Sequence, residues 1–120
     1  MSTVLLVEDS LTDREVMTHY LQQAGLAVVS VKSVEEAQAK LASQKPQLII
    51  LDVVLPGQSG FELCREIKTD PGTSQIPVVI CSTKDTDVDK LWGNMLGADA
   101  YLPKPVVQTE LLLTIRQLMK

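Results

Sequence analysis

Carboxylate side chains follow two of the aliphatic runs in this sequence, at the points where those runs end. Glu8 and Asp9 come directly after residues 4–7, and Asp52 comes directly after residues 48–51. Further apolar residues follow Asp52, and a carboxylate within an apolar stretch is costly to bury without a partner. Neighbouring carboxylates repel one another, which raises their pKa values unless a cation lies among them. If these three side chains lie together, we therefore expect a bound cation.

Hydroxyl groups and an ammonium group follow two later aliphatic runs. Ser82 and Thr83 come after residues 78–81, and Lys104 comes shortly after a fifth run. A carboxylate nucleophile, a bound cation, a lysine and a hydroxyl group are the parts that phosphoryl transfer requires. In that reaction Asp52 would attack and become an acyl phosphate, while the cation and Lys104 neutralise the phosphoryl oxygens. Ser82 would donate a hydrogen bond to one of those oxygens.

The candidate ligands favour a hard cation. All are oxygen donors, and no histidine or cysteine belongs to the set. Mg²⁺ or a similar ion is therefore favoured over zinc. Each residue alone also has a purely structural interpretation: Asp52 as a cap of a loop or helix, Asp9 or Ser10 as the N-cap of a helix, and Lys104 as a surface lysine. Only their joint placement points to a site.

The aliphatic runs alternate with segments whose apolar residues recur at helical spacing. The runs cover residues 4–7, 28–31, 48–51, 78–81 and 100–102. The clearest helical stripes are formed by Val16, Met17, Tyr20 and Leu21, by Val88, Leu91, Trp92 and Met95, and by Leu111, Leu112, Ile115 and Leu118. Strands that are continuously apolar are buried on both faces. The alternation predicts a doubly wound α/β fold, a (βα)5 three-layer sandwich with a parallel sheet.

Two further helices have start signals of their own. Residues 33–36 and 59–62 both have the pattern of a capping box, with serine at the first position and glutamate at the fourth. In an open parallel sheet, ligands bind beyond the carboxyl ends of the strands. The acidic residues, the hydroxyl groups and Lys104 would therefore share one edge of the sheet.

Composition limits the class of protein. The 120 residues, of which 45% are hydrophobic, suffice for one domain spanning 1–120. A net charge of −4 without a basic cluster argues against nucleic acid and anionic membranes as partners. No apolar stretch is long enough to cross a bilayer, and no signal peptide is evident. We expect a cytoplasmic protein in which Cys64 and Cys81 are reduced thiols.

Taken together, these motifs resemble the receiver domain of bacterial two-component response regulators, of the chemotaxis-regulator type. The matching segments are residues 4–10, 51–60, 77–82 and 97–105, which occur in this order. The resemblance implies a flavodoxin-like sheet of strand order 2-1-3-4-5. It also implies that Asp52 accepts a phosphoryl group from a histidine kinase. Asp9, Asp52 and the backbone carbonyl of Val54 would bind Mg²⁺, with Glu8 acting mostly through water.

The resemblance also assigns the parts of a switch. Ser82, followed by Thr83, matches the switch hydroxyl, Tyr101 matches the switch aromatic residue, and Lys104 matches the family's lysine. The Lys104–Pro105 bond is expected to be cis, an isomer essentially confined to proline. On phosphorylation Ser82 would move toward the phosphoryl group and Tyr101 would turn inward. The face of the fourth helix, fifth strand and fifth helix, which includes Leu91, Trp92 and Tyr101, would then change its binding to a partner.

A narrower resemblance and some departures refine this hypothesis. Residues 83–85 and 89–93, which precede Gly97 and Ala98, are similar to single-domain receivers of type IV pilus chemosensory systems, which serve twitching or phototactic motility. Thr is commoner than Ser82 at the switch position. The positions of Val54 and Lys84 tune loss of the phosphoryl group in this family, and an apolar Val54 cannot orient an attacking water. We therefore expect slow loss of the phosphoryl group from Asp52.

Three alternatives compete with a receiver. An aspartate-nucleophile phosphatase would carry a second aspartate where Val54 stands. A nucleotide- or flavin-binding module would need a glycine-rich phosphate loop, which the sequence lacks. A degenerate receiver would lack one of the key residues, and all are present. We expect no enzyme activity beyond self-phosphorylation and self-dephosphorylation. The output would be contact with a target protein, such as motility machinery, or competition for phosphate, by a monomer or weak dimer.

Overall fold

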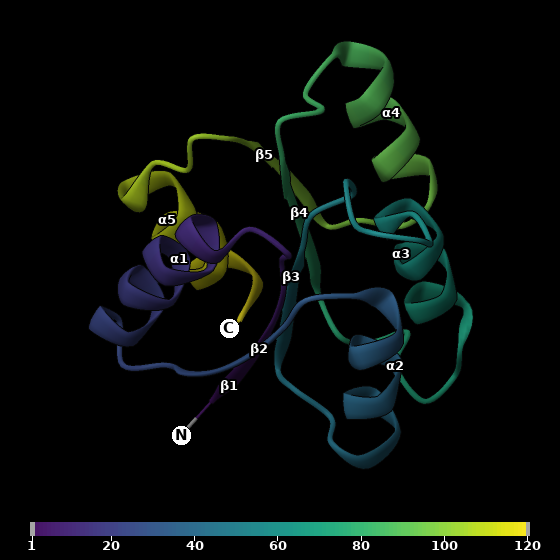
Figure 1. Cartoon of the computed structure of the whole chain (residues 1–120), viewed down its shortest axis with the longest axis horizontal. Helices are drawn as coiled ribbons and strands as arrows, with labels where there is room; N and C mark the ends of the chain where they lie inside the picture. Colours follow the sequence, from purple (N-terminus) through teal and green to yellow (C-terminus); the bar gives the residue numbers. More distant parts are fainter. Residues whose placement is uncertain (1, 120) are drawn as a thin grey trace.

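Strands and helices alternate without exception in the computed structural model, which describes residues 2–119 (Figure 1). The elements are β1 (Thr3–Val7), α1 (Leu11–Gln23), β2 (Ala27–Val31), α2 (Val34–Ser43), β3 (Leu48–Leu51), α3 (Gly60–Thr69), β4 (Val78–Ser82), α4 (Asp87–Met95), β5 (Ala100–Pro103) and α5 (Gln108–Leu118). Each strand begins within one residue of the predicted aliphatic run. The predicted α/β class is confirmed.

The five strands form one parallel sheet in the order β2-β1-β3-β4-β5. Val7 at the end of β1 is paired with Leu51 at the end of β3. The residues that follow them therefore leave the sheet next to each other. At the other side, Ser82 at the end of β4 is paired with Pro103 of β5. The register alone thus brings Glu8, Asp52, Ser82 and Lys104 to one edge of the sheet.

Helices cover both faces of the sheet. Figure 1 shows α1 and α5 on one side and α2, α3 and α4 on the other. Alternate strand residues enter the two layers: Leu5 and Val7 pack with buried residues of α2 and α3, whereas Val4 and Leu6 pack with those of α1 and α5. Because the strands are buried on both faces, their uninterrupted aliphatic character is explained.

The helix starts differ in detail from the predicted capping boxes. Ser33 accepts a hydrogen bond from the Glu36 N–H, but the Glu36 carboxylate accepts from Lys32 instead of Ser33. Ser59 accepts from Phe61 rather than from the fourth residue of its box. The reciprocal capping box lies at α4, between Thr86 and Asp89. Side-chain caps at these helices are still present, so the predicted starts hold. Of the predicted capping-box bonds, the one from the Glu36 N–H to Ser33 forms, whereas the others are replaced.

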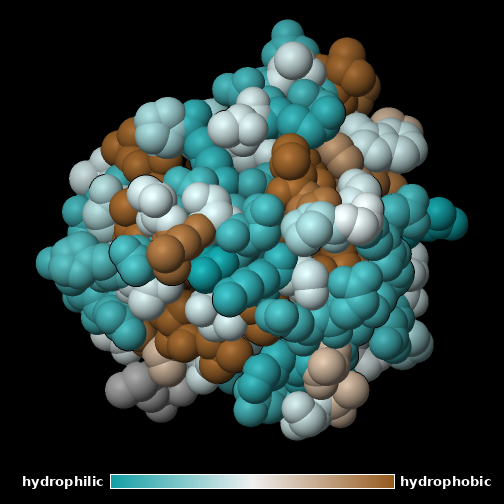
Figure 2. Space-filling view, in the orientation of Figure 1, coloured by the Kyte–Doolittle hydropathy of each residue, from teal (hydrophilic) through white to brown (hydrophobic). Residues whose placement is uncertain are grey.

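The apolar stripe of α4 faces solvent. Val88, Leu91, Trp92 and Met95 are all exposed, and Trp92 retains 48% of its accessible surface. Figure 2 shows hydrophobic side chains at the surface over this part of the molecule. The buried residue of α4 is Gly93. The stripe predicted the helix correctly, but it does not belong to the core.

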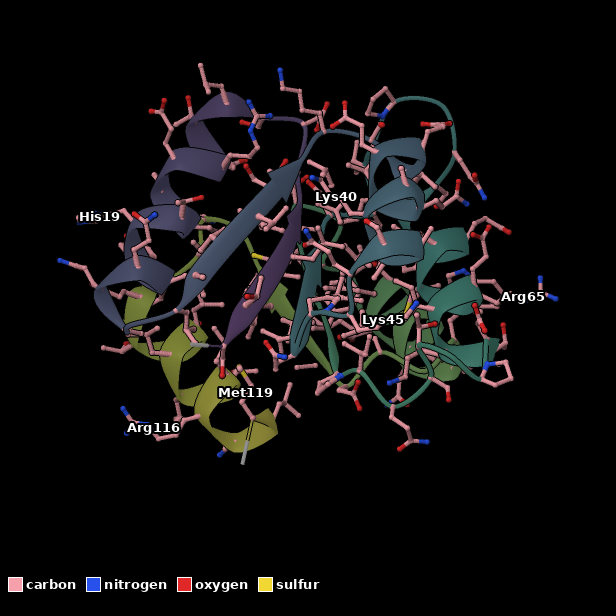
Figure 3. The ribbon with its side chains drawn as sticks, turned by 90° about the horizontal axis from the view of Figure 1, so that it is seen from below. His19, Lys40, Lys45, Arg65, Arg116 and Met119 are labelled. Atoms are coloured by element: carbon pink, nitrogen blue, oxygen red, sulfur yellow. The ribbon has the colours of Figure 1, made fainter. Side chains whose placement is uncertain are left out.

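No helix between residues 2 and 119 is long and apolar enough to cross a membrane. Cys64 and Cys81 are free and buried. Burial raises the pKa of Cys64 to about 11 and that of Cys81 to about 12, so both thiols are protonated at neutral pH. The lone histidine, His19, lies on the exposed side of α1 (Figure 3).

Candidate functional site

The ammonium group of Lys104 lies among three carboxylates at the edge of the sheet. Its Nζ donates hydrogen bonds to Glu8 Oε1 at 2.6 Å, to Asp52 Oδ2 at 2.7 Å and to Asp13 Oδ2 at 2.8 Å. These residues come from the ends of β1, β3 and β5 and from the first turn of α1. A lysine ammonium has three N–H donors, so every one of them is used.

Burial of this cluster is uneven. Relative to full exposure, the side chains of Glu8, Asp52 and Lys104 are 1%, 6% and 9% accessible, whereas that of Asp13 is 40% accessible. Burial alone would lower the pKa of Lys104, but its hydrogen bonds to the carboxylates outweigh this and raise that pKa above its usual value. Lys104 is therefore charged throughout the physiological range.

Glu8 is the most deeply buried acid of the cluster. Its backbone N–H donates to the Val31 carbonyl, and its Oε2 accepts from the Ser10 N–H at 3.2 Å. Burial raises the pKa of Glu8, and the bonds from Lys104 and Ser10 oppose that rise. The buried carboxylate is therefore stabilised as an anion mainly by Lys104.

Asp52 occupies the position that the sequence singled out. Its backbone N–H donates to the Val7 carbonyl, its Oδ1 accepts from the Val54 N–H at 3.0 Å, and its Oδ2 accepts from Lys104. The side chain of Val54 is itself exposed. Each carboxylate oxygen of Asp52 thus accepts a hydrogen bond, and these bonds hold the carboxylate at the carboxyl end of β3.

The predicted metal ligands are only partly assembled. Glu8 and Asp52 lie together, but Asp9 is exposed, and its backbone carbonyl accepts from Arg14 Nη1. Among residues 2–119, no three acidic, histidine or cysteine side chains are grouped in a way that could hold a metal. The oxygen donors fit Mg²⁺ by their chemistry. In this structure, however, the positive charge between Glu8 and Asp52 is the ammonium of Lys104.

The predicted hydroxyl groups lie at the adjoining strand end. Ser82 is fully buried, its Oγ accepts from the Lys84 N–H at 3.2 Å, and its carbonyl accepts from the Lys104 N–H at 3.1 Å. Thr83 is exposed. The Lys104–Pro105 bond is cis, the isomer that the resemblance implies. The backbone bond between Ser82 and Lys104 ties the hydroxyl position to that of the ammonium.

Tyr101 contacts both the β4–α4 loop and α4. Its hydroxyl donates to the Lys84 carbonyl, and its half-buried ring lies against Gly93, where a Cβ would come within 2.9 Å of the ring. Burial raises the pKa of Tyr101 to about 12, so its hydroxyl stays a donor. Its inward turn on phosphorylation stays a prediction; in this structure the Tyr101 hydroxyl is bound to the β4–α4 loop.

Asp13 was not predicted from the sequence. It lies in the first turn of α1, where its backbone N–H donates to the N-cap Ser10. An acidic residue in a first turn is commonly explained by the helix dipole, so its type and position gave no separate signal. Only the structure shows that its carboxylate reaches Lys104.

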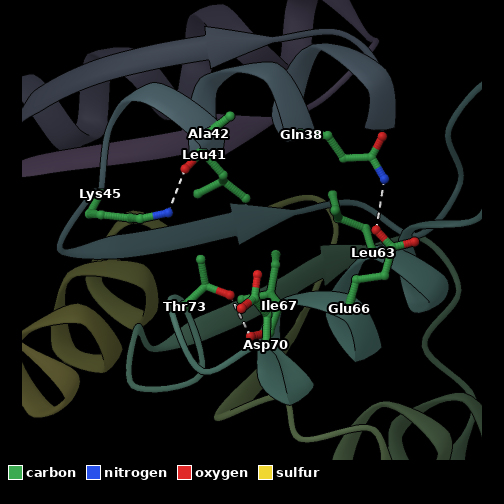
Figure 4. A pocket seen from close by; sticks show the side chains of 9 residues that line it. All are labelled: Gln38, Leu41, Ala42, Lys45, Leu63, Glu66, Ile67, Asp70 and Thr73. Atoms are coloured by element: carbon green, nitrogen blue, oxygen red, sulfur yellow. Dashed lines mark hydrogen bonds between the residues drawn. The ribbon is translucent and has the colours of Figure 1, made fainter.

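A cavity of about 240 Å³ lies elsewhere, between α2 and α3 (Figure 4). Its polar side chains are engaged with their own surroundings: Lys45 donates to the Leu41 carbonyl, and Thr73 donates to the Ile67 carbonyl. It is remote from the carboxyl ends of the strands, and no member of the Lys104 cluster lines it. It therefore does not compete with the carboxylate cluster as the candidate site.

Known proteins match this chain over nearly its whole length. A family model described as the response regulator receiver domain matches residues 4–116. The chain is 38% identical over 119 residues to Protein PilH of Pseudomonas aeruginosa, covering 99% of this chain and 98% of PilH. It spans about half the length of several other curated relatives that it matches.

Solved structures also match over nearly the whole chain. The chemotaxis response regulator CheY4 of Vibrio cholerae superposes with a TM-score of 0.90 at 31% identity, covering 98% of both chains. The phosphorylated cyanobacterial phytochrome response regulator RcpA superposes with a TM-score of 0.84 at 30% identity, covering 97% of this chain and 89% of that chain. The strand order 2-1-3-4-5 belongs to this shared fold.

Proposed function

Because the chain belongs to the response regulator receiver domain family, we propose that it is a phosphorylation-activated signalling switch whose phosphoacceptor is Asp52. The observation that carries this proposal is the buried Asp52 carboxylate, which is held by Lys104 beside Glu8 at the strand ends. A solved relative with the same fold is the phosphorylated response regulator RcpA, which supports the proposal. The phosphoryl donor would be the phosphohistidine of a histidine kinase.

The residues at the site account for the transfer. A carboxylate oxygen of Asp52 attacks phosphorus, the P–N bond to the donor imidazole breaks, and that imidazole takes up a proton. Lys104 is placed to neutralise an oxygen of the arriving phosphoryl group, and Ser82 supplies a hydroxyl from the next strand. Asp9, Asp52 and the Val54 carbonyl, with Glu8 acting through water, would hold Mg²⁺, which supplies charge neutralisation.

The phosphoacceptor assignment has a direct test. On incubation with acetyl phosphate and Mg²⁺, the protein should gain the mass of one phosphoryl group, and Asp52→Asn should gain none because an amide is not a comparable nucleophile. Intact-protein mass spectrometry measures both. Asp9→Asn serves as a comparison that keeps the acceptor but weakens the proposed cation site. An equal adduct on the Asp52→Asn variant would refute the assignment.

The output surface is proposed to be the face formed by α4, β5 and α5. Leu91 and Trp92 are exposed on α4, while Tyr101 of β5 bonds to the β4–α4 loop. That loop also carries the Lys84 N–H that binds Ser82. A movement of Ser82 toward a phosphoryl group would therefore be transmitted to Tyr101 and α4 through one loop.

Trp92 should report this movement. The chain has one tryptophan, so adding BeF₃⁻ with Mg²⁺, which mimics a phosphoryl group on Asp52, should change the Trp92 fluorescence. The backbone amide signals of Leu91 and Trp92 should also shift in NMR spectra. This second measurement reports the movement even if the fluorescence of Trp92 does not change. Asp52→Asn is the control. Bound BeF₃⁻ without any change at these residues would exclude α4 from the switch.

The pathway proposal is narrower. The support for a chemosensory system that controls type IV pilus motility or phototaxis is the resemblance of residues 83–85 and 89–93, together with the 38% identity to PilH across both chains. The partners would be a histidine kinase and a downstream target protein such as motility machinery. The chain would act in the cytoplasm, as a monomer or weak dimer, without enzyme activity on other substrates.

A further inference from the structure

We infer that Asp13 is a positioning residue: it binds the third N–H of Lys104 in the unphosphorylated protein and releases it when a phosphoryl group reaches Asp52. This inference rests on the proposed function. The distance from Lys104 Nζ to Asp13 Oδ2 is 2.8 Å, well within hydrogen-bond range. The backbone of Asp13 is fixed because its N–H donates to the N-cap Ser10.

The donors of Lys104 are fully used in this structure. Glu8, Asp13 and Asp52 each accept one hydrogen bond from Nζ, and an ammonium has three to give. A phosphoryl oxygen on Asp52 can bind Lys104 only if one of these bonds breaks. The free-energy cost of binding a phosphoryl oxygen to Lys104 therefore depends on which carboxylate loses its hydrogen bond.

The solvent exposure of the three carboxylates indicates that Asp13 can lose its hydrogen bond from Lys104 at the smallest free-energy cost. Releasing Glu8, which is 1% accessible, would leave a buried anion without its cation. Asp52 is itself the acceptor and stays beside Lys104. Asp13 is 40% accessible, so water can replace the lost hydrogen bond. Its bond to Lys104 is accordingly the weakest of the three.

Charge adds to the competition. Three carboxylates and one ammonium carry a combined charge of −2, because −3 and +1 are summed over Glu8, Asp13, Asp52 and Lys104. An arriving phosphoryl group is also anionic and is repelled by the excess negative charge. Removing the charge of Asp13 lowers this repulsion and frees a donor of Lys104. Both effects favour binding of a phosphoryl mimic.

The test uses the whole chain and BeF₃⁻ titrated at fixed, saturating Mg²⁺, with binding followed by ¹⁹F NMR. Asp13→Asn should lower the half-saturating BeF₃⁻ concentration by about 1.5- to fivefold, the range expected for loss of a partly exposed charge pair. Asp13→Glu, which keeps a carboxylate, should return the affinity toward that of the parent. Glu15→Gln removes the same charge from an exposed position of α1 and should leave the affinity unchanged.

A second measurement makes the inference independent of BeF₃⁻ binding. Exchange of the Lys104 ammonium protons with water, measured by NMR, should be slow in the parent and in Glu15→Gln, and faster in Asp13→Asn. Equal exchange in the parent and Asp13→Asn would overturn the inference, as would equal BeF₃⁻ affinity or equal tightening by Glu15→Gln. If the parent does not bind BeF₃⁻ at all, the proposed function fails, while the exchange rates still decide whether Asp13 holds Lys104.

Discussion

Replacing Lys104 with methionine is expected to lower the free energy of unfolding at neutral pH by about 3–5 kcal/mol, the range for leaving a buried charge without its partner. Methionine has a similar length and no charge. The variant keeps Glu8 and Asp52 buried but removes the cation that both contact at 2.6–2.7 Å. The partly exposed Asp13 contributes little to the loss because water can solvate it.

The effect of this substitution should depend on pH. Lys104 has a raised pKa, so its contribution to stability is complete below the ordinary lysine pKa and is lost only as the pH rises through the raised value. Glu8 also has a raised pKa, and for an acid this means that stability falls as the pH rises from about 4.3, its unfolded value. In the parent, the hydrogen bond from Lys104 limits the rise in the pKa of Glu8. Lys104→Met removes this bond, so the variant should lose more stability than the parent as the pH rises from about 4.3.

Urea unfolding at several pH values measures this difference. The difference in the free energy of unfolding between the parent and Lys104→Met should become smaller as the pH falls toward the ordinary glutamate pKa, because Glu8 becomes neutral in the folded and in the unfolded state. Mg²⁺ should restore part of the stability of the variant at neutral pH, because a bound cation stabilises the folded state. Lys90→Met on the exposed surface of α4 is the matched control. Equal stability of the two variants would show that the cluster needs no ammonium.

Replacing Gly60 with alanine is expected to destabilise the fold by about 3 kcal/mol, at the upper end for overpacking. Gly60 opens α3, and its N–H donates to the Val53 carbonyl, so the helix begins directly on the backbone that follows β3. A Cβ here would clash with the Asp52 carbonyl oxygen and come within 2.6 Å of Val53 Cα. Because these are main-chain atoms, no side-chain rotation relieves the clash.

The same clash should act on the site. Since the atoms that must move belong to Asp52 and Val53, Gly60→Ala should weaken BeF₃⁻ binding as well as stability. Gly72→Ala is the control: its Cβ would meet nothing closer than 3.6 Å, and it should change stability by less than about 1 kcal/mol. Urea unfolding and ¹⁹F NMR measure the two effects. A Gly60→Ala protein with parental stability would mean that α3 can shift without strain.

The fold could be predicted because its signals are local and redundant. Each strand is an uninterrupted aliphatic run, and in a parallel sheet the residue after each run must lie at the same edge. The order of runs and polar residues along the chain therefore suffices to predict that Glu8, Asp52 and Lys104 lie together. The hydrogen bonds of Lys104 agree with that placement.

The remaining details depend on tertiary contacts that no local pattern encodes. Asp13 has the type and position of an ordinary first-turn acid, and only the reach of Lys104 from β5 gives it another role. The α4 stripe has the spacing of a core-facing helix, but the buried contact is made through Gly93 against Tyr101. Helical spacing identifies a face without saying whether the protein itself covers it.

The bonds of Lys104 also bear on the order in which the chain acquires its activity. They join residues separated by 96, 91 and 52 positions along the sequence, and contacts of such long separation form late because loop closure must precede them. During synthesis, β1 and β3 emerge long before β5. Until Lys104 arrives, Glu8 and Asp52 have no ammonium between them, and two neighbouring carboxylates without a cation repel each other. A chain that can hold a phosphoryl group is therefore one that has finished folding.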